Sequence, residues 1–297
     1  MYFEKSLMQN SEQPLVSVII ASYNHAPYIE ASIESVLAQS YPNIELLVTD
    51  DGSRDDSVER ISRLQELHGF DFRVQENKGL SRTLNEAIER ARGSLIAPLG
   101  SDDIMLERIA RQVAYLQDKP EVGICAGNIQ EIDGSGSLRG APKNLPFRRL
   151  DFEDVFLDRK PGAPAPTLMF RREAIEKVGG FDEQIRLEDL LIELKITRSG
   201  YSLDILPDVL AHYRVHATNT YKNFHFMVEN VMKTYAQFSD HPAYPEVCAR
   251  YRNSMMLKCV RECPDLAMRL LKEQPLKYWR FKTLRAAFRI ITAHKRS

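Results

Sequence analysis

Two adjacent aspartates, Asp102 and Asp103, follow an apolar run in the first half of the chain. Neighbouring carboxylates at the end of a buried strand repel each other and are costly to remove from water. A divalent cation such as Mg²⁺ or Mn²⁺ offsets this repulsion, because it binds carboxylates together with phosphate oxygens. Alternatively, Asp103 caps a helix that begins near Met105. That alternative does not explain a second pair, Asp50 and Asp51, which ends another apolar run.

These acidic pairs must be positioned by the elements around them. Apolar runs predict strands over 15–21, 44–49, 72–75, 95–99 and 122–132, and helical spacing predicts helices over 27–39, 58–67, 81–91 and 105–117. The alternation indicates an α/β fold with a mainly parallel sheet flanked by helices. Parallel strands bring their carboxyl ends to one edge, where ligands bind, so the polar residues after these strands should converge.

The alternation weakens beyond residue 135. The pattern predicts a strand over 167–171, a helix over 188–198, two strands over 202–206 and 209–213, and helices from about 224 onward. Glu188 and Asp189 form a third acidic pair at a predicted helix N-terminus, where negative charge is favourable.

Four motifs agree in order and spacing with one known family. They are residues 16–24 (VSVIIASYN), 48–53 (VTDDGS), 77–79 (NKG) with Asn85, and 100–103 (GSDD). Over residues 14–220 the chain resembles the family 2 glycosyltransferases of GT-A (Rossmann-like) fold. It departs from the family at Ala21, where Pro or Thr is usual, and in having Ser101-Asp102-Asp103 in place of a strict Asp-x-Asp. We expect a flexible tail over 1–13, a catalytic domain over 14–220 and a C-terminal helical extension over 221–297.

The resemblance implies roles for the donor site. Asp51 would accept a hydrogen bond from the pyrimidine base of a nucleotide sugar, and Ala21 and Tyr23 would line the base and ribose pocket. Asp102 would contact the ribose or a metal-bound water. Asp103 would coordinate Mg²⁺ or Mn²⁺, which bridges the diphosphate.

Further cationic and polar residues lie near the same edge. Asn77, Lys78 and Arg82 are placed where a cation could pair with phosphate, although Lys78 and Arg82 fit a solvated helix face equally well. His216 ends a Tyr-Arg-Val-His stretch. In the family, a histidine in such a stretch can complete the metal site or contact the diphosphate, although a lone histidine fits a structural or exposed position equally well.

Glu188 and Asp189 resemble the Glu-Asp motif of inverting members. The resemblance implies that Asp189 is the base that deprotonates the attacking hydroxyl and that Glu188 shapes the acceptor site. The simpler alternative, negative charge at a helix N-terminus, is compatible with that role.

Composition excludes several classes of protein. The chain has 297 residues, 43% apolar and 27% charged, with a net charge of −1, so disorder and nucleic-acid binding are not expected. Its four cysteines form no CxxC pair, which favours reduced, buried thiols. No apolar run reaches the roughly 18 residues of a membrane span. The N-terminus does not resemble a signal peptide, and Met8 is an alternative start, so we expect a cytoplasmic protein.

The last 23 residues, 275–297, contain seven Lys or Arg and no Asp or Glu. Helical spacing would place an apolar face opposite the basic residues; that face comprises Leu276, Trp279, Leu284, Phe288 and Ile291. A basic amphipathic helix binds anionic membrane surfaces, so we expect peripheral association with the inner membrane. The alternative is that this apolar face packs on the rest of the protein.

We therefore expect an inverting, metal-dependent glycosyltransferase. Its donor would be dTDP-rhamnose or a UDP-hexose, and its acceptor a hydroxyl of a bacterial glycan or lipid-linked glycan such as lipopolysaccharide. A nucleotidyltransferase is a competing reading, but it would need a Gly-rich phosphate loop after the first strand, which residues 22–27 (SYNHAP) do not provide. A non-catalytic nucleotide-sugar binding module is the other.

Overall fold

The computed structural model describes residues 13–142, 144–217 and 219–294, so the expected tail over 1–13 lies almost wholly outside the described residues. The elements in chain order are β1 (Val16–Ser22), α1 (Ile29–Leu37), β2 (Ile44–Asp50), α2 (Ser57–His68), β3 (Asp71–Val74), α3 (Leu80–Arg90), β4 (Leu95–Gly100), β5 (Ile104–Met105), α4 (Ile109–Leu116), β6 (Val122–Asp133), β7 (Arg148–Leu150), α5 (Phe152–Phe156), η1 (Ala165–Thr167), β8 (Met169–Arg171), α6 (Arg172–Lys177), α7 (Glu188–Arg198), β9 (Ser202–Val215), η2 (Thr220–Lys222), α8 (Phe224–Ala236), α9 (Tyr244–Cys259), α10 (Pro264–Lys272), η3 (Leu276–Tyr278) and α11 (Phe281–His294).

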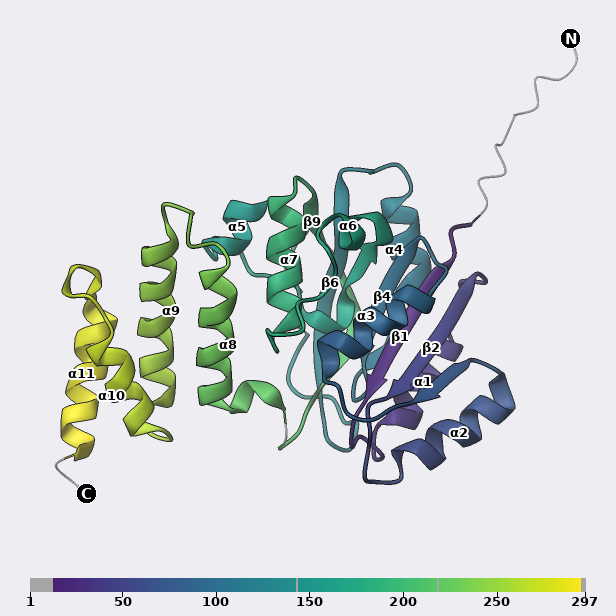
Figure 1. The fold of residues 1–297 in the computed structure, drawn as a ribbon, viewed down its shortest axis with the longest axis horizontal. Helices are drawn as coiled ribbons and strands as arrows, with labels where there is room; N and C mark the ends of the chain where they lie inside the picture. Colours follow the sequence, from purple (N-terminus) through teal and green to yellow (C-terminus); the bar gives the residue numbers. More distant parts are fainter. Residues whose placement is uncertain (1–12, 143, 218, 295–297) are drawn as a thin grey trace, which may run out of the picture.

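A nine-stranded sheet forms the centre of the α/β region, in the order β3-β2-β1-β4-β8-β6-β9-β5, with β7 paired to β9. β3, β2, β1 and β4 are parallel, as the sequence predicts for this half. β8 runs antiparallel to β4 and β6, and β6 and β9 are parallel. The sheet as a whole is therefore mixed, and its parallel half brings the carboxyl ends of β1, β2 and β4 to one edge (Figure 1).

Helices cover both faces of the sheet. On one face α1, α2 and α4 pack with Val18 and Ile20 of β1, and on the other α3, α6 and α7 pack with Ile19. Alternate side chains of one strand thus enter opposite layers. This arrangement explains why the strand reads as a continuous apolar run, since both of its faces are buried.

The segment after β4 differs from the prediction. The sequence predicts a helix from Met105, but α4 begins only at Ile109. Ile104 and Met105 form β5, which pairs antiparallel with β9. Asp103 therefore does not cap a helix, and the simpler explanation of this carboxylate is wrong.

β9 is one long strand where the sequence predicts two. Pro207 interrupts the apolar pattern, yet pairing with β6 continues across register shifts near Asn128. The Asn128 side-chain amide donates to the Pro207 carbonyl at 2.9 Å. A bulge of this kind accommodates a residue that cannot donate a ladder hydrogen bond.

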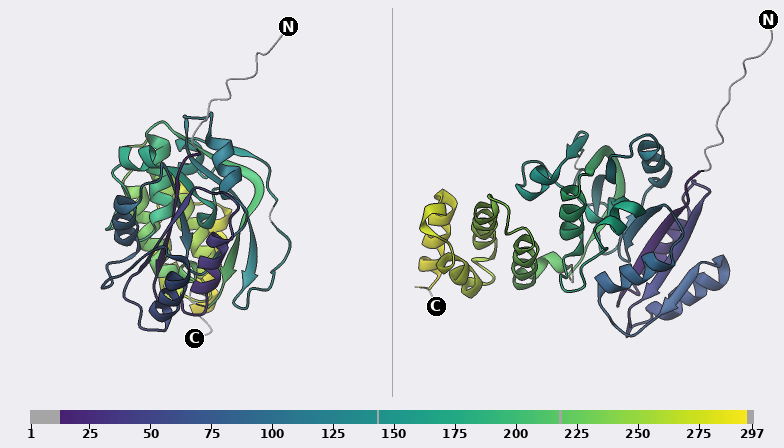
Figure 2. Two further views of the ribbon diagram at one scale, coloured as in Figure 1. Left: turned by 90° about the vertical axis from the view of Figure 1, so that its right-hand side faces the viewer. Right: turned by 45° about the horizontal axis from the view of Figure 1, so that its top comes forward.

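Helices α8 to α11 extend the molecule on the side away from α2 (Figures 1 and 2). Met255 and Met256 of α9 pack with Leu266 and Leu270 of α10 and with Ile290 of α11. A smaller apolar cluster joins α5, α7 and the end of α8. Among the described residues, no helix is both long and apolar enough to cross a membrane.

Candidate active site

The loop after β1 is held by the loop after β2. Three successive backbone N–H groups donate to side chains of that second loop and of the first residue of α2: Asn24 N to Ser53 Oγ (2.8 Å), His25 N to Ser57 Oγ (3.1 Å) and Ala26 N to Asp55 Oδ2 (3.0 Å). The two loops therefore form one rigid edge at the carboxyl ends of the parallel strands.

Asp51, the expected partner of the nucleotide base, is buried at the end of β2. Its Oδ1 accepts from Gln75 Nε2 (2.8 Å) and Lys78 N (2.8 Å), and its Oδ2 accepts from Gly79 N (2.9 Å). Asn77 Nδ2 donates to the Asp51 carbonyl at 2.9 Å. Since a carboxylate offers roughly four acceptor positions, about one remains for an N–H of a ligand.

The other residues expected to bind the donor are more exposed than Asp51. Lys78 Nζ and Arg82 Nε both pair with Glu86, at 2.9 and 3.1 Å, so in this structure both cations lie along α3. Ala21 is half-buried at the end of β1, and Tyr23 just beyond it is 44% exposed.

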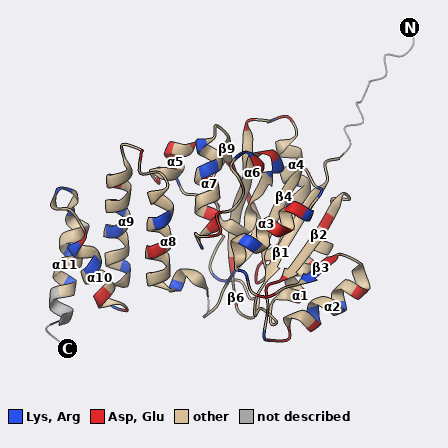
Figure 3. Cartoon of the chain, viewed as in Figure 1, with Lys and Arg blue, Asp and Glu red and all other residues tan. Residues whose placement is uncertain are grey.

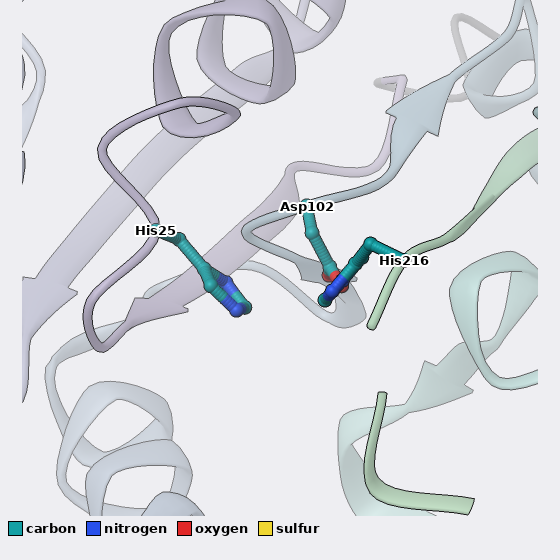
Figure 4. Close-up of side chains that lie close together, drawn as sticks. All are labelled: His25, Asp102 and His216. Carbon is teal, nitrogen blue, oxygen red and sulfur yellow. The ribbon is translucent and has the colours of Figure 1, made fainter. Parts of the chain in front are cut away.

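Asp102 meets two histidines from distant parts of the chain. His216, just after β9, places its Nε2 2.8 Å from Asp102 Oδ2. His25, in the loop after β1, places its Nδ1 2.7 Å from Ser101 Oγ. One potential ligand atom from each of His25, Asp102 and His216 lies within 4.8 Å of the other two, and Figure 4 shows the three side chains facing one another. This donor set fits a divalent cation, because imidazole nitrogen and carboxylate oxygen are both common ligands.

Asp103, the residue expected to coordinate metal, has a different environment. Its Oδ1 accepts from the backbone N of Arg214 at 2.8 Å, and the residue is 4% exposed. Burial, reinforced by the charge of Asp102, raises the pKa of Asp103 well above its ordinary value. The structure therefore brings Asp102, and not Asp103, into the histidine cluster.

Arg214 ties the acidic loop to β9. Its Nε donates to the Asp102 carbonyl at 2.7 Å, and its guanidinium lies 4.9 Å from the centre of the Tyr28 ring. Asn219 supports the neighbouring histidine by accepting from His216 N at 2.6 Å. These contacts fix the backbone that carries Asp102 and His216.

Glu188 and Asp189 occupy the first turn of α7. The loop before this helix is fastened to α3: Asn85 Nδ2 donates to the Phe181 carbonyl (2.8 Å), and Phe181 N donates to Asn85 Oδ1 (2.9 Å). This reciprocal pair sets the acidic residues of α7 relative to the loop around Asp51, because α3 begins immediately after that loop.

The acidic pair of α7 is strongly perturbed. Burial, together with the charge of Asp189, raises the pKa of Glu188 to about 8, and burial raises the pKa of Asp189 as well. The pKa of Tyr213 on β9 is also raised, first by burial and then by Asp103, Asp102 and, more weakly, Asp189. The same tyrosine therefore responds to the charges of the loop after β4 and, more weakly, to that of Asp189 on α7.

Sequence reasoning missed His25. Its position three residues after the end of β1, at the edge where ligands bind, was a usable signal, but a lone histidine has no distinctive spacing. Burial lowers the pKa of His25, which keeps the ring neutral and able to act as a ligand. Ser101 and Asn219 were also missed, because their roles depend on contacts across the fold.

Comparison with known proteins identifies the family of the chain. Residues 17–179 match the family model described as glycosyl transferase family 2. An uncharacterized glycosyltransferase of Nostoc sp. is 32% identical over 216 residues, which cover 69% of this chain and 66% of that protein. The O-antigen biosynthesis glycosyltransferase WbnJ of Escherichia coli is 29% identical, over 70% of this chain and 83% of that protein.

Two solved structures share the fold. TarS of S. aureus in complex with UDP-GlcNAc superposes with a TM-score of 0.65 at 17% identity, covering 89% of this chain and 82% of that one. The mannosyltransferase PcManGT of Pyrobaculum calidifontis, in complex with GDP-Man and Mn²⁺, gives 0.63 at 20% identity, covering 96% and 87%. The sheet, its acidic strand ends and the matched family model lead to one conclusion: the chain is a glycosyltransferase of GT-A fold and belongs to glycosyltransferase family 2.

Proposed function

We propose that this glycosyltransferase moves a sugar from a nucleoside diphosphate sugar to a hydroxyl of a bacterial glycan or lipid-linked glycan, with inversion and with Mg²⁺ or Mn²⁺. The proposed donors are dTDP-rhamnose and the UDP-hexoses, and the proposed acceptor class is lipopolysaccharide or a related envelope glycan. The E. coli relative named for O-antigen biosynthesis supports the acceptor class. The TarS and PcManGT complexes, which hold UDP-GlcNAc and GDP-Man, support a nucleotide-sugar donor.

The proposal rests on two sets of acidic residues: Asp102 in the loop after β4, and Glu188 and Asp189 in the first turn of α7. Asp102 and His216 would hold the metal, whose charge stabilises the leaving diphosphate. Asp51 would accept an N–H of the nucleotide base through its remaining acceptor position. Asp189 would take the proton of the attacking hydroxyl, and Glu188 would shape the acceptor side. A single displacement between these groups inverts the anomeric centre.

Thermal stabilisation by nucleotides tests this function. We expect UDP or dTDP to raise the melting temperature of the wild-type protein more than GDP or CDP, and to do so with Mn²⁺ but much less with EDTA. A ligand that binds only the folded state at about 100 times its Kd adds about 2.7 kcal/mol of stability, which a melting curve detects readily. No shift with any of the four diphosphates, with or without metal, would refute the donor assignment.

We also propose that the helical segment 221–297 attaches the enzyme to the cytoplasmic face of the inner membrane. Four apolar side chains near its end are largely exposed: Leu276 (77%), Phe281 (80%), Leu284 (56%) and Phe288 (69%). Exposed Lys277, Arg280 and Arg285 lie among them, and Figure 3 shows basic residues along this end of the chain. The prediction of one helical face is wrong for Leu276 and Trp279, because both precede α11: Leu276 begins η3, and Trp279 ends it with its indole N–H donating to the Gln274 carbonyl at 3.1 Å. Ile291 is outside the residues whose side chains are described.

Vesicle sedimentation tests the membrane proposal. We expect wild type to bind vesicles that contain phosphatidylglycerol, and the double variant Phe281→Ser/Leu284→Ser to lose most of that binding. Arg285→Gln should weaken binding about fivefold, since one basic residue near an anionic surface is worth about 1 kcal/mol.

Leu67 on α2 is 72% exposed and provides a matched control, so Leu67→Ser should bind vesicles like wild type. Equal binding to neutral vesicles, or binding that survives the double variant, would contradict the proposal.

A further inference from the structure

The His25 ring is built into the acidic loop. Its Nδ1 lies 2.7 Å from Ser101 Oγ, the residue immediately before Asp102. Its ring centre is 5.9 Å from that of His216, at an interplanar angle of 85°. One ring nitrogen of each histidine and one Asp102 oxygen lie mutually within 4.8 Å, so each side chain can offer one ligand atom to the same ion (Figure 4).

The backbone around His25 is fixed before any ligand arrives. The N–H groups of His25 and of its two neighbours donate to side chains of the loop after β2 and of Ser57 at the start of α2. On the other flank, the His25 ring makes an edge contact with Tyr28, with ring centres 6.0 Å apart. A histidine that only occupied a solvated loop would not need these restraints, whereas a ligand gains affinity when its position is fixed in advance.

The contact with Ser101 also suits metal binding chemically. A histidine that ligates a metal through one ring nitrogen usually donates its other N–H to a neighbouring oxygen, which sets the tautomer and the ring orientation. With Nδ1 donating to Ser101 Oγ, the lone pair of Nε2 is available to a metal. The same loop would therefore supply Asp102 as a ligand and Ser101 as the residue that orients another ligand.

We infer that His25 is a third protein ligand of the divalent metal, acting through Nε2, and that it makes the site prefer Mn²⁺ or Co²⁺ to Mg²⁺. The inference rests on the proposed metal dependence and adds the ligand and the selectivity. Mg²⁺ is bound through oxygen ligands and waters, whereas the affinity of nitrogen-containing sites rises along the transition series from Mn²⁺ to Co²⁺. Two imidazoles and one carboxylate are thus a poor set for Mg²⁺ and a good one for the transition metals.

Manganese binding, measured by electron paramagnetic resonance with and without UDP, tests the inference without using activity. We expect His25→Gln to weaken Mn²⁺ binding at least about tenfold and Ser101→Ala to weaken it by a smaller factor, in line with losses seen on changing metal-site partners. Pulsed measurements on bound Mn²⁺ should show nitrogen couplings from two imidazoles in wild type and from one in His25→Gln. The Mn²⁺ to Mg²⁺ affinity ratio should fall in the same variant.

His241 offers a matched control, because its Nε2 also pairs with a carboxylate, that of Glu153 at 2.7 Å, but near the C-terminal helices. His241→Gln should bind Mn²⁺ like wild type. If His25→Gln keeps both sets of nitrogen couplings and only UDP binding weakens, the histidine contacts phosphate and the inference is wrong. If Asp102→Asn does not change Mn²⁺ binding, the metal site of the proposed function itself is wrong.

Discussion

Asp189→Asn should reduce turnover by about 10²- to 10⁴-fold while leaving nucleotide-sugar binding unchanged, which is the usual contribution of a general base. Asparagine keeps the shape of the side chain and can still accept the hydrogen bond that Leu190 N donates to Asp189 Oδ1 at 2.7 Å. It cannot accept a proton from the attacking hydroxyl. The loss should therefore appear in kcat, because the proposed donor contacts are made by Asp51, Asp102 and His216 and not by Asp189.

The neighbouring carboxyl is the control for this experiment. Because the pKa of Glu188 is raised to about 8, this side chain is mostly neutral at pH 7, and Glu188→Gln should keep most of the activity there. In wild type, activity should fall with decreasing pH as Asp189 is protonated, at a higher pH than for an ordinary aspartate. In Glu188→Gln the fall in activity at low pH should remain, because Asp189 is still present. Any change in rate near pH 8 should disappear, because the group that titrates there has been removed. A fully active Asp189→Asn variant would exclude Asp189 as the base.

The parts of the fold that could be predicted from sequence are those fixed by local pattern. β1 reads as a strand because both of its faces are buried, and α7 was predicted with its observed bounds, Glu188–Arg198. The errors arose where distant pairing decides the structure. Ile104 and Met105 look like the start of a helix, but they pair with His212 and Ala211 of β9, more than a hundred residues later.

The same distinction applies to the site. The acidic pairs were identifiable because carboxylates at strand ends are unusual and their edge is set by the topology. Which aspartate of a pair faces a ligand depends on hydrogen bonds to residues far away in the sequence, and a local sequence pattern does not reveal them. Arg214 N engages Asp103, and His216 engages Asp102, so the two aspartates point to different partners. His25 joins the same cluster from the loop after β1, far in the sequence from both Asp102 and His216, so no local motif connects the three residues.

A matched pair of substitutions separates the two aspartates. Asp102→Asn should abolish the Mn²⁺-dependent stabilisation by nucleotide and lower turnover about 10³-fold or more, since a metal contributes several kcal/mol to stabilising the transition state. Asp103→Asn should retain Mn²⁺ binding, because its amide oxygen can still accept from Arg214 N and because Asp103 lies outside the cluster of His25, Asp102 and His216. Both effects are measured by melting curves with and without Mn²⁺ and by a donor-turnover assay.

The opposite result would be equally informative. If Asp103→Asn loses the metal effect and Asp102→Asn keeps it, the expectation from the family resemblance is correct, and Asp103 must turn from Arg214 N toward the metal when the donor binds. That rotation would leave the Arg214 N–H without its partner in the buried strand, at a cost of about 1–3 kcal/mol. The geometry of the protein therefore favours Asp102, whose carboxylate already faces His216 and requires no such rearrangement.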